Sequence, residues 1–253
     1  LMAGTRAYSM VLGLPLVMKM VEWIGWTTTF IILGSAIAFP LIGYLVSSRR
    51  PESSQKNGSL NIYKHFSETL KIPGIAWSLT GFFMVRLTGS APFIFTSLWL
   101  FQTYDLEITQ RALLILVYGV GEILGSWLSV FIINRLGARN TFNLGVIGTF
   151  VFVSILVFIK LPVTAIALGL LLLSLSDRSY GMAFWRIYIP QDRARTGTLS
   201  SLGNVSFAGA IAVVTGLGTP VIQHFGWKTA GGSILVSLII GAIILRASLF
   251  TPD

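Results

Sequence analysis

The feature that most constrains the fold is a series of long apolar segments, each about as long as a bilayer is thick. Residues 27–48, for example, contain no charge at all. A transmembrane helix needs about 20 apolar residues. Only 11% of the chain is charged, less than half of the roughly 25% found in soluble domains. These properties exclude a soluble enzyme and a disordered chain, and they predict an all-α polytopic membrane protein.

About eight transmembrane helices are predicted, because none of the apolar segments alternates with the period of two that strands show. A polar stretch at residues 49–72 interrupts them once and is the candidate linker, which leaves 1–48 and 73–253 as the two membrane regions. The predicted helices cover residues 7–21, 27–48, 74–101, 112–133, 141–159, 162–185, 199–222 and 227–250.

The positions of the basic residues support this count when the eight helices are placed alternately across a membrane. Twelve of the eighteen Lys and Arg residues then lie on the same side as the linker and both chain ends, four lie on the other side, and Arg86 and Arg178 lie inside predicted helices. Basic residues beside helices are retained in the cytoplasm, so we expect an integral multi-pass plasma-membrane protein with both ends of this chain cytoplasmic. The net charge of +9 is then explained by topology and the lipid bilayer, without nucleic acid.

Two places in the chain have the same order of residues, and their tryptophans lie 201 positions apart. Gly13-Leu14-Pro15 precedes Gly25-Trp26, and Gly218-Thr219-Pro220 precedes Gly226-Trp227. Six predicted helices make up one period, and repeated halves are how many secondary transporters are built. The chain therefore reads as the last two helices of one unit followed by all six of the next.

A turn motif adds a more specific signal. Asn134-Arg135-Leu136-Gly137-Ala138-Arg139 follows the fourth predicted helix. Together with the basic linker and the two Gly-Trp pairs, it resembles the major facilitator superfamily. The turn is similar to the family's cytoplasmic Asp-Arg-x-Gly-Arg-Arg motif, with Asn134 in place of Asp and with Arg135, Gly137 and Arg139 kept. Gly13-Leu14-Pro15 resembles the Gly-Pro element of helix five in drug exporters.

The resemblance implies a truncated transporter, helices five to twelve of twelve, with the missing helices on the same full-length chain. It implies movement of a small-molecule substrate by alternating access, as proton-coupled efflux of an organic solute and without a cofactor. The alternative is a non-transporting membrane subunit or a receptor-like protein, which would show no saturable flux. A membrane-embedded enzyme is disfavoured because no His, Cys or paired-carboxylate constellation is present, and we expect no metal site.

Four charged residues lie inside predicted helices: Arg86, Glu122, Asp177 and Arg178. Even the lower estimates put a charge at the bilayer centre at about 2.5–3.5 kcal/mol, so each needs a partner, water or a function. Arg86 and Glu122 each lie about 18 Å from the predicted cytoplasmic helix end at ~1.5 Å per residue. Asp177 and Arg178 are adjacent and point about 100° apart on a helix. We expect each to pair across to another helix, where Arg86 and Glu122 are the available opposite charges.

Two roles remain open for these charges. They could hold the second half together as ion pairs, or they could bind substrate and couple protons, because burial disfavours the charged form of a carboxyl group. A similar choice applies to aromatic residues of the third predicted helix, which could stack on a substrate or pack against neighbouring side chains and lipid; these are Phe82, Phe83, Phe93, Phe95 and Trp99.

Two local patterns complete the predictions. Gly121 and Gly125, four residues apart, favour close approach of another helix. In the linker, apolar residues recur near helical spacing and predict a short amphipathic helix at the cytoplasmic surface; they are Leu60, Tyr63, Phe66 and Leu70.

Overall fold

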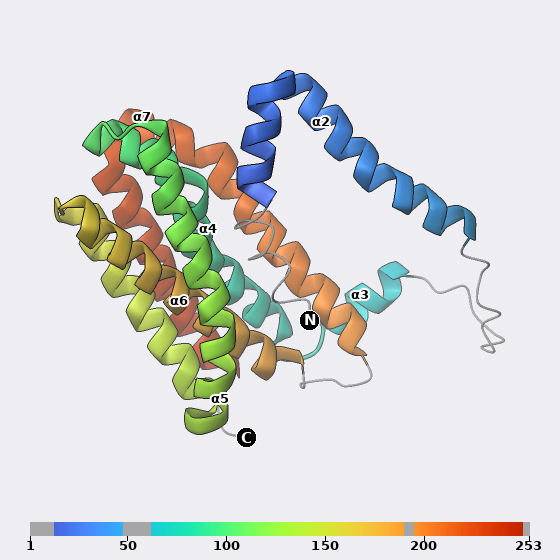
Figure 1. Ribbon diagram of the computed structural model, residues 1–253. Helices are drawn as coiled ribbons and strands as arrows, with labels where there is room; N and C mark the ends of the chain where they lie inside the picture. The colour runs from blue at the N-terminus through green and yellow to red at the C-terminus, as the bar shows by residue number, and fades with distance from the viewer. Residues whose placement is uncertain (1–12, 48–61, 190–194, 250–253) are drawn as a thin grey trace.

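The computed structural model describes residues 13–47, 62–189 and 195–249, and these residues form a helical protein without strands (Figure 1). The predicted all-α class is confirmed. Five of the helices are long and apolar enough to cross a membrane, and α3 is short. The helices are α2 (Leu14–Ser47), α3 (Ile62–Leu70), α4 (Ile75–Tyr104), α5 (Ile108–Phe158), α6 (Val163–Tyr188) and α7 (Thr196–Leu249).

Three of the long helices are each broken at one glycine. These are Gly25 in α2 (φ 77°, ψ 165°), Gly137 in α5 (φ 80°, ψ 159°) and Gly226 in α7 (φ 77°, ψ 170°). This part of backbone space is open essentially only to glycine. Figure 1 shows α5 and α7 each doubling back at such a point. The five long helices therefore make eight segments, at the predicted places, although the first is described only from residue 13.

The sequence repeat has a structural counterpart. Gly25 and Gly226 occupy matching positions of the repeat, and both have a φ of 77°. In each case a tryptophan follows the break, and Trp26 stacks on Phe30 with ring centroids 5.3 Å apart. Trp227 instead packs edge-on against Phe95 of α4. The same sequence pattern thus produces the same reversal of the chain at both places.

The first half of α5 packs closely on α6 through small residues. A β-carbon on Gly121 would overlap with the hydroxyl of Ser174, and one on Gly125 would lie 2.9 Å from the β-carbon of Arg178. The predicted close approach at these glycines is therefore confirmed. The second half of α5 reaches α6 in the same way, because a β-carbon on Gly145 would lie 2.6 Å from a backbone nitrogen of α6.

Helix α4 packs on α7 in a similar manner. A β-carbon on Gly241 would lie 2.7 Å from the carbonyl oxygen of Gly81. Two hydroxyls also cross between these helices: Thr88 donates to the carbonyl of Ile234 at 2.6 Å, and Ser237 donates to the carbonyl of Met84 at 2.9 Å. These contacts fix α4 against the second half of α7.

Helix α5 has its polar and small residues inside and its bulky apolar residues outside. Glu122 and Ser129 are buried, whereas Trp127 is 73% exposed and Phe131 is 53% exposed. This arrangement is the reverse of a soluble helix, and it is what a helix bordered by lipid requires. Polar groups here can find partners only within the protein.

Helices α2 and α3 lie outside the bundle formed by α4 to α7 (Figure 1). Bulky side chains of α2 such as Trp23 and Phe39 are exposed. Helix α3 confirms the linker helix from residue 62, and Glu68 links it to Arg195 before α7 at 4.0 Å. The N-terminal part of the linker, including Leu60, lies outside the described residues.

Candidate functional site

The four intramembrane charges form two ion pairs that cross between helices. Arg86 of α4 contacts Asp177 of α6 at 3.1 Å, and Arg178 of α6 contacts Glu122 of α5 at 3.6 Å. Adjacent residues of α6 therefore pair with opposite charges on different neighbours. Each charge was expected to pair with an opposite charge on another helix, and this is confirmed; between Glu122 and Asp177, the partner of Arg86 is Asp177.

The Arg86–Asp177 pair is completed by a tyrosine. The Nη1 of Arg86 donates to both carboxylate oxygens of Asp177, at 3.2 and 3.1 Å, and to the hydroxyl of Tyr180 at 3.2 Å. The Tyr180 hydroxyl donates in turn to Asp177 Oδ1 at 2.5 Å. Arg86 and Asp177 are only 4% and 2% exposed. The negative charge of Asp177 is thus held by two different donor residues.

Aromatic rings enclose the guanidinium of Arg86. Its Cζ lies 4.7 Å from the ring centroid of Phe207 in α7 and 5.7 Å from that of Tyr180. A cation over an aromatic face is stabilised by about 2 kcal/mol or more when desolvated. Tyr180 and Phe207 were not predicted as site residues. The spacing of Tyr180, three residues after Asp177 on the same helix face, was the signal available for it.

Gly89 of α4 makes room for this pair. A β-carbon at this position would overlap with Asp177 Oδ1 and with the hydroxyl of Tyr180. Gly89 lies three residues after Arg86, so it lies on the same face of α4. The site therefore depends on a residue without a side chain, which sequence reasoning did not identify.

In the second pair, Arg178–Glu122, only the arginine side chain has a further hydrogen bond among the described residues. Arg178 donates from Nε to the hydroxyl of Ser126 at 3.1 Å in addition to its contact with Glu122. Glu122 is fully buried, yet within the described part of the chain neither of its carboxylate oxygens accepts a hydrogen bond. Glu122 also interacts electrostatically with Arg86. The two buried carboxylates therefore have different environments, one saturated with donors and one held by charge alone.

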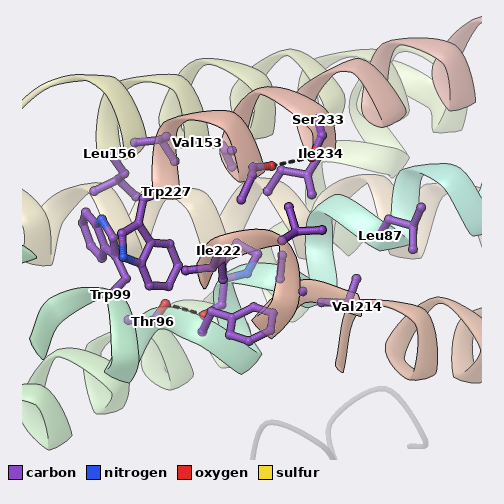
Figure 2. A pocket seen from close by; sticks show the side chains of 18 of the residues that line it. Leu87, Thr96, Trp99, Val153, Leu156, Val214, Ile222, Trp227, Ser233 and Ile234 are labelled. Carbon is purple, nitrogen blue, oxygen red and sulfur yellow. Dashed lines mark hydrogen bonds between the residues drawn. The ribbon is translucent and has the colours of Figure 1, made fainter. Parts of the chain in front are cut away.

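The aromatic residues of α4 divide between packing and a cavity. Phe82 stacks on Phe184 of α6 with centroids 3.8 Å apart, which is packing. Phe95 and Trp99 instead line a cavity of about 310 Å³, together with residues of α5, α6 and α7 (Figure 2). Phe93 is 39% exposed and lies at the surface of the bundle.

Comparisons with known proteins agree with this architecture. The family model described as Major Facilitator Superfamily matches residues 1–215. The chain belongs to the Major Facilitator Superfamily. One curated relative is an uncharacterized MFS-type transporter of Bacillus subtilis (strain 168), YceJ, 28% identical over 147 residues. That match covers 57% of this chain and 37% of the relative, so the chain spans little more than a third of the relative's length.

The Major Facilitator Superfamily is a family of membrane transporters, and the curated relative is named as one. Among the described residues, no group of three or more His, Asp or Glu side chains could hold a metal ion. The site therefore brings together two buried ion pairs and the hydroxyl of Tyr180.

The turn that resembled the family motif lies at the break in α5. Gly137 forms the break itself, and its carbonyl accepts a hydrogen bond from the hydroxyl of Thr141 at 2.8 Å. The guanidinium of Arg135 lies 4.5 Å from the ring centroid of Phe131. Asn134, Arg135 and Arg139 are exposed. The motif therefore forms a basic surface at one end of the bundle, away from the buried charges.

Proposed function

We propose that the protein is a secondary active transporter that exports a small organic solute in exchange for protons, by alternating access. The observation that carries this proposal is the state of Glu122: a fully buried carboxylate, 3.6 Å from Arg178, whose oxygens accept no hydrogen bond within the described residues. A buried polar group without hydrogen bonds is costly. A purely structural ion pair would gain from donors to that carboxylate, as Asp177 does.

Protonation of Glu122 would change the charge of the site by one. Neutral Glu122 no longer holds Arg178, whose side chain is 15% exposed and keeps Ser126 as a hydrogen-bond partner. Arg178 can then turn toward water or toward a solute. Loss of the proton restores the pair. Two states of one ion pair, biased by proton and solute, are what coupled alternating access requires.

The Arg86–Asp177 pair has a supporting role in this scheme. Asp177 accepts hydrogen bonds from Arg86 and Tyr180, which stabilise its charged form. We assign it to holding α4 and α6 together while the Glu122 pair opens and closes. Residues 73–253 form the transporting half with these charges, residues 1–48 belong to the preceding half, and 49–72 join them.

The orientation follows from the basic residues. The linker, the turn at Arg135 and Arg139, and both chain ends are assigned to the cytoplasm of the plasma membrane, because most Lys and Arg residues gather there. The direction of transport is assigned from the resemblance of Gly13-Leu14-Pro15 to the helix-five element of drug exporters.

The proposal is tested with the gene product that carries this chain, reconstituted in liposomes with an imposed pH gradient. Ethidium, a small aromatic cation, is the first probe of a panel that also includes uncharged aromatic compounds. We expect saturable accumulation of at least one compound that collapses when the gradient is dissipated. Absence of saturable flux for the whole panel would contradict the transport proposal and favour the non-transporting alternative.

Glu122→Gln tests the coupling step separately. The variant should keep exchange of solute without a gradient, which shows that it folds and binds, and should lose accumulation driven by the gradient. Glu22→Gln is the matched control, because Glu22 is exposed on α2, and it should behave as the wild type. Gradient-driven accumulation that survives in Glu122→Gln would show that another group carries the proton.

A further inference from the structure

The cavity between α4 and α7 extends from the level of the ion pairs to the far end of the bundle. At one end it is lined by Leu87, the neighbour of Arg86, and at the other by Trp227, which follows the break at Gly226. Figure 2 shows Leu87 at one end of the cavity and Trp99 and Trp227 together at the other. Its volume of about 310 Å³ lies at the lower limit of ligand pockets, roughly 300–1,000 Å³.

The walls of the cavity are apolar and aromatic. Trp99 and Trp227 lie together at one end (Figure 2). Phe95 of α4 and the buried Leu170 and Leu173 of α6 also line the cavity. Trp99, Leu170 and Leu173 belong to one core cluster, against which Trp227 also packs. Aromatic rings favour offset-stacked or edge-to-face contact with another ring, so this lining fits a flat aromatic group.

The polar side chains of the lining are committed to partners within the protein. The hydroxyl of Thr96 donates to the carbonyl of Pro92, and the hydroxyl of Ser237 donates to that of Met84. The hydroxyl of Ser233 donates to the carbonyl of Ala230, and the indole N–H of Trp227 donates to Gln102. Water needs two to four polar partners to be held in a cavity. These groups favour an apolar guest over water.

The cavity also carries no charged side chain in its lining. The charge nearest to it in sequence, Arg86 beside Leu87, is already neutralised by Asp177 at 3.1 Å. A charged guest would lose its hydration without gaining an opposite charge, which is costly in an apolar site. The charge balance therefore selects an uncharged molecule.

Access to the cavity is available from α7. Val213 and Leu217 line the cavity and are 38% and 62% exposed, whereas Leu170 and Leu173 at its inner side are 1% and 2% exposed. A guest can enter past the two exposed residues, and it reaches the two buried ones only when it occupies the cavity.

We propose that this cavity is a binding site for an uncharged aromatic small molecule, seated between Trp99, Trp227 and Phe95. The site lies within the second half of the protein, on the opposite side of the ion pairs from the turn at Gly137. The site does not depend on the proton step at Glu122, so a binding measurement alone tests this proposal.

Benzophenone tests the site directly, because it is an uncharged aromatic ketone that inserts into nearby C–H bonds when irradiated. The gene product in liposomes is irradiated with benzophenone, and the labelled positions are read by mass spectrometry. We expect labelling at Leu170 or Leu173, together with the exposed apolar residues that face lipid. The carboxylate analogue 4-benzoylbenzoate should leave Leu170 and Leu173 unlabelled.

Val213→Trp blocks the entrance, and Leu217→Trp is a second blocking variant should the first fold poorly. Labelling at Leu170 and Leu173 should be lost in either variant, because the indole ring closes the path to them. Val205→Trp is the matched control: Val205 is 66% exposed on the same half of α7 and does not line the cavity. It should label as the wild type does.

Three results would overturn the proposal. The first is labelling confined to lipid-facing residues. The second is equal labelling of the two leucines by the charged analogue. The third is labelling of these leucines by a phospholipid with a photoreactive acyl chain that excess benzophenone does not reduce, which would assign the cavity to lipid.

Discussion

Gly89 of α4 and Asp177 of α6 lie so close together that any side chain on Gly89 would occupy the position of the Asp177 carboxylate. The contact between Arg86 and Asp177 therefore requires that residue 89 has no β-carbon. This relationship makes a glycine part of the charged site, although it contributes no charge and no hydrogen bond.

Gly89→Ala should separate the Arg86–Asp177 pair and destabilise the protein. Overpacking alone costs about 1–3 kcal/mol, and weakening of the buried pair adds to that loss. The free energy of unfolding in mixed micelles measures the effect. Gly181→Ala is the control, because a β-carbon there would lie 3.8 Å from Arg86 Nη1, an ordinary contact. Equal stability of the two variants would contradict the proposed role of Gly89.

Arg86→Ala should leave Asp177 charged and without its guanidinium. Breaking a buried pair by removing one partner costs about 3–5 kcal/mol, whereas removing both partners can be neutral. Arg86→Ala should therefore reduce the yield of monodisperse protein, and Arg86→Ala with Asp177→Asn should restore it. Adding Glu122→Gln to Arg86→Ala should restore nothing, because Glu122 pairs with Arg178. If Glu122→Gln, and not Asp177→Asn, restored the yield of the Arg86→Ala variant, Arg86 would be shown to pair with Glu122 instead.

Gly137→Ala should destabilise the break in α5 through the backbone alone. No atom lies within 4 Å of a β-carbon there, but the φ of 80° with a ψ of 159° is closed to other residues, and strain of this kind costs about 1–3 kcal/mol. Gly216→Ala, in a helical position with equally open surroundings, should be neutral or should stabilise by up to about 1 kcal/mol. Thermal unfolding of the two variants distinguishes these outcomes.

Single cysteines should report the orientation of the chain, because the sequence contains no other cysteine. Arg139→Cys should react with a membrane-impermeant maleimide only in inside-out vesicles, and Lys160→Cys only in right-side-out cells. Both side chains are exposed, so access to reagent does not limit either reaction. The same sidedness for both positions would rule out the eight-segment topology.

Much of this architecture could be predicted from the sequence, because charge and hydropathy along a helix indicate how deep each residue lies in the membrane. The position of Arg86, twelve residues into its predicted helix, placed it at mid-membrane, and charge balance left Glu122 and Asp177 as its candidate partners; the structure pairs it with Asp177. Rotation about the helix axis was harder to predict, because lipid and protein interior are both apolar, so apolar residues alone do not show which face of a helix is buried.

The information on rotation was present in the polar residues. In α5 the small and polar positions Gly121, Glu122, Gly125, Ser126 and Ser129 are all buried, and the bulky residues Leu124, Trp127 and Leu128 between them are exposed. Gly89, Phe207 and the cavity could not be obtained in this way, because each depends on how two helices from distant parts of the chain meet. The spacing of residues within one helix carries no information about how two such helices pack together.

The opposed pairing of Asp177 and Arg178 has a mechanical consequence for α6. One residue is tied to α4 and the next, about 100° away around the helix, is tied to α5. A rotation of α6 about its own axis would change both ion-pair distances at once, so both pairs oppose it. Loss of one pair would remove the opposition toward one neighbouring helix and keep it toward the other.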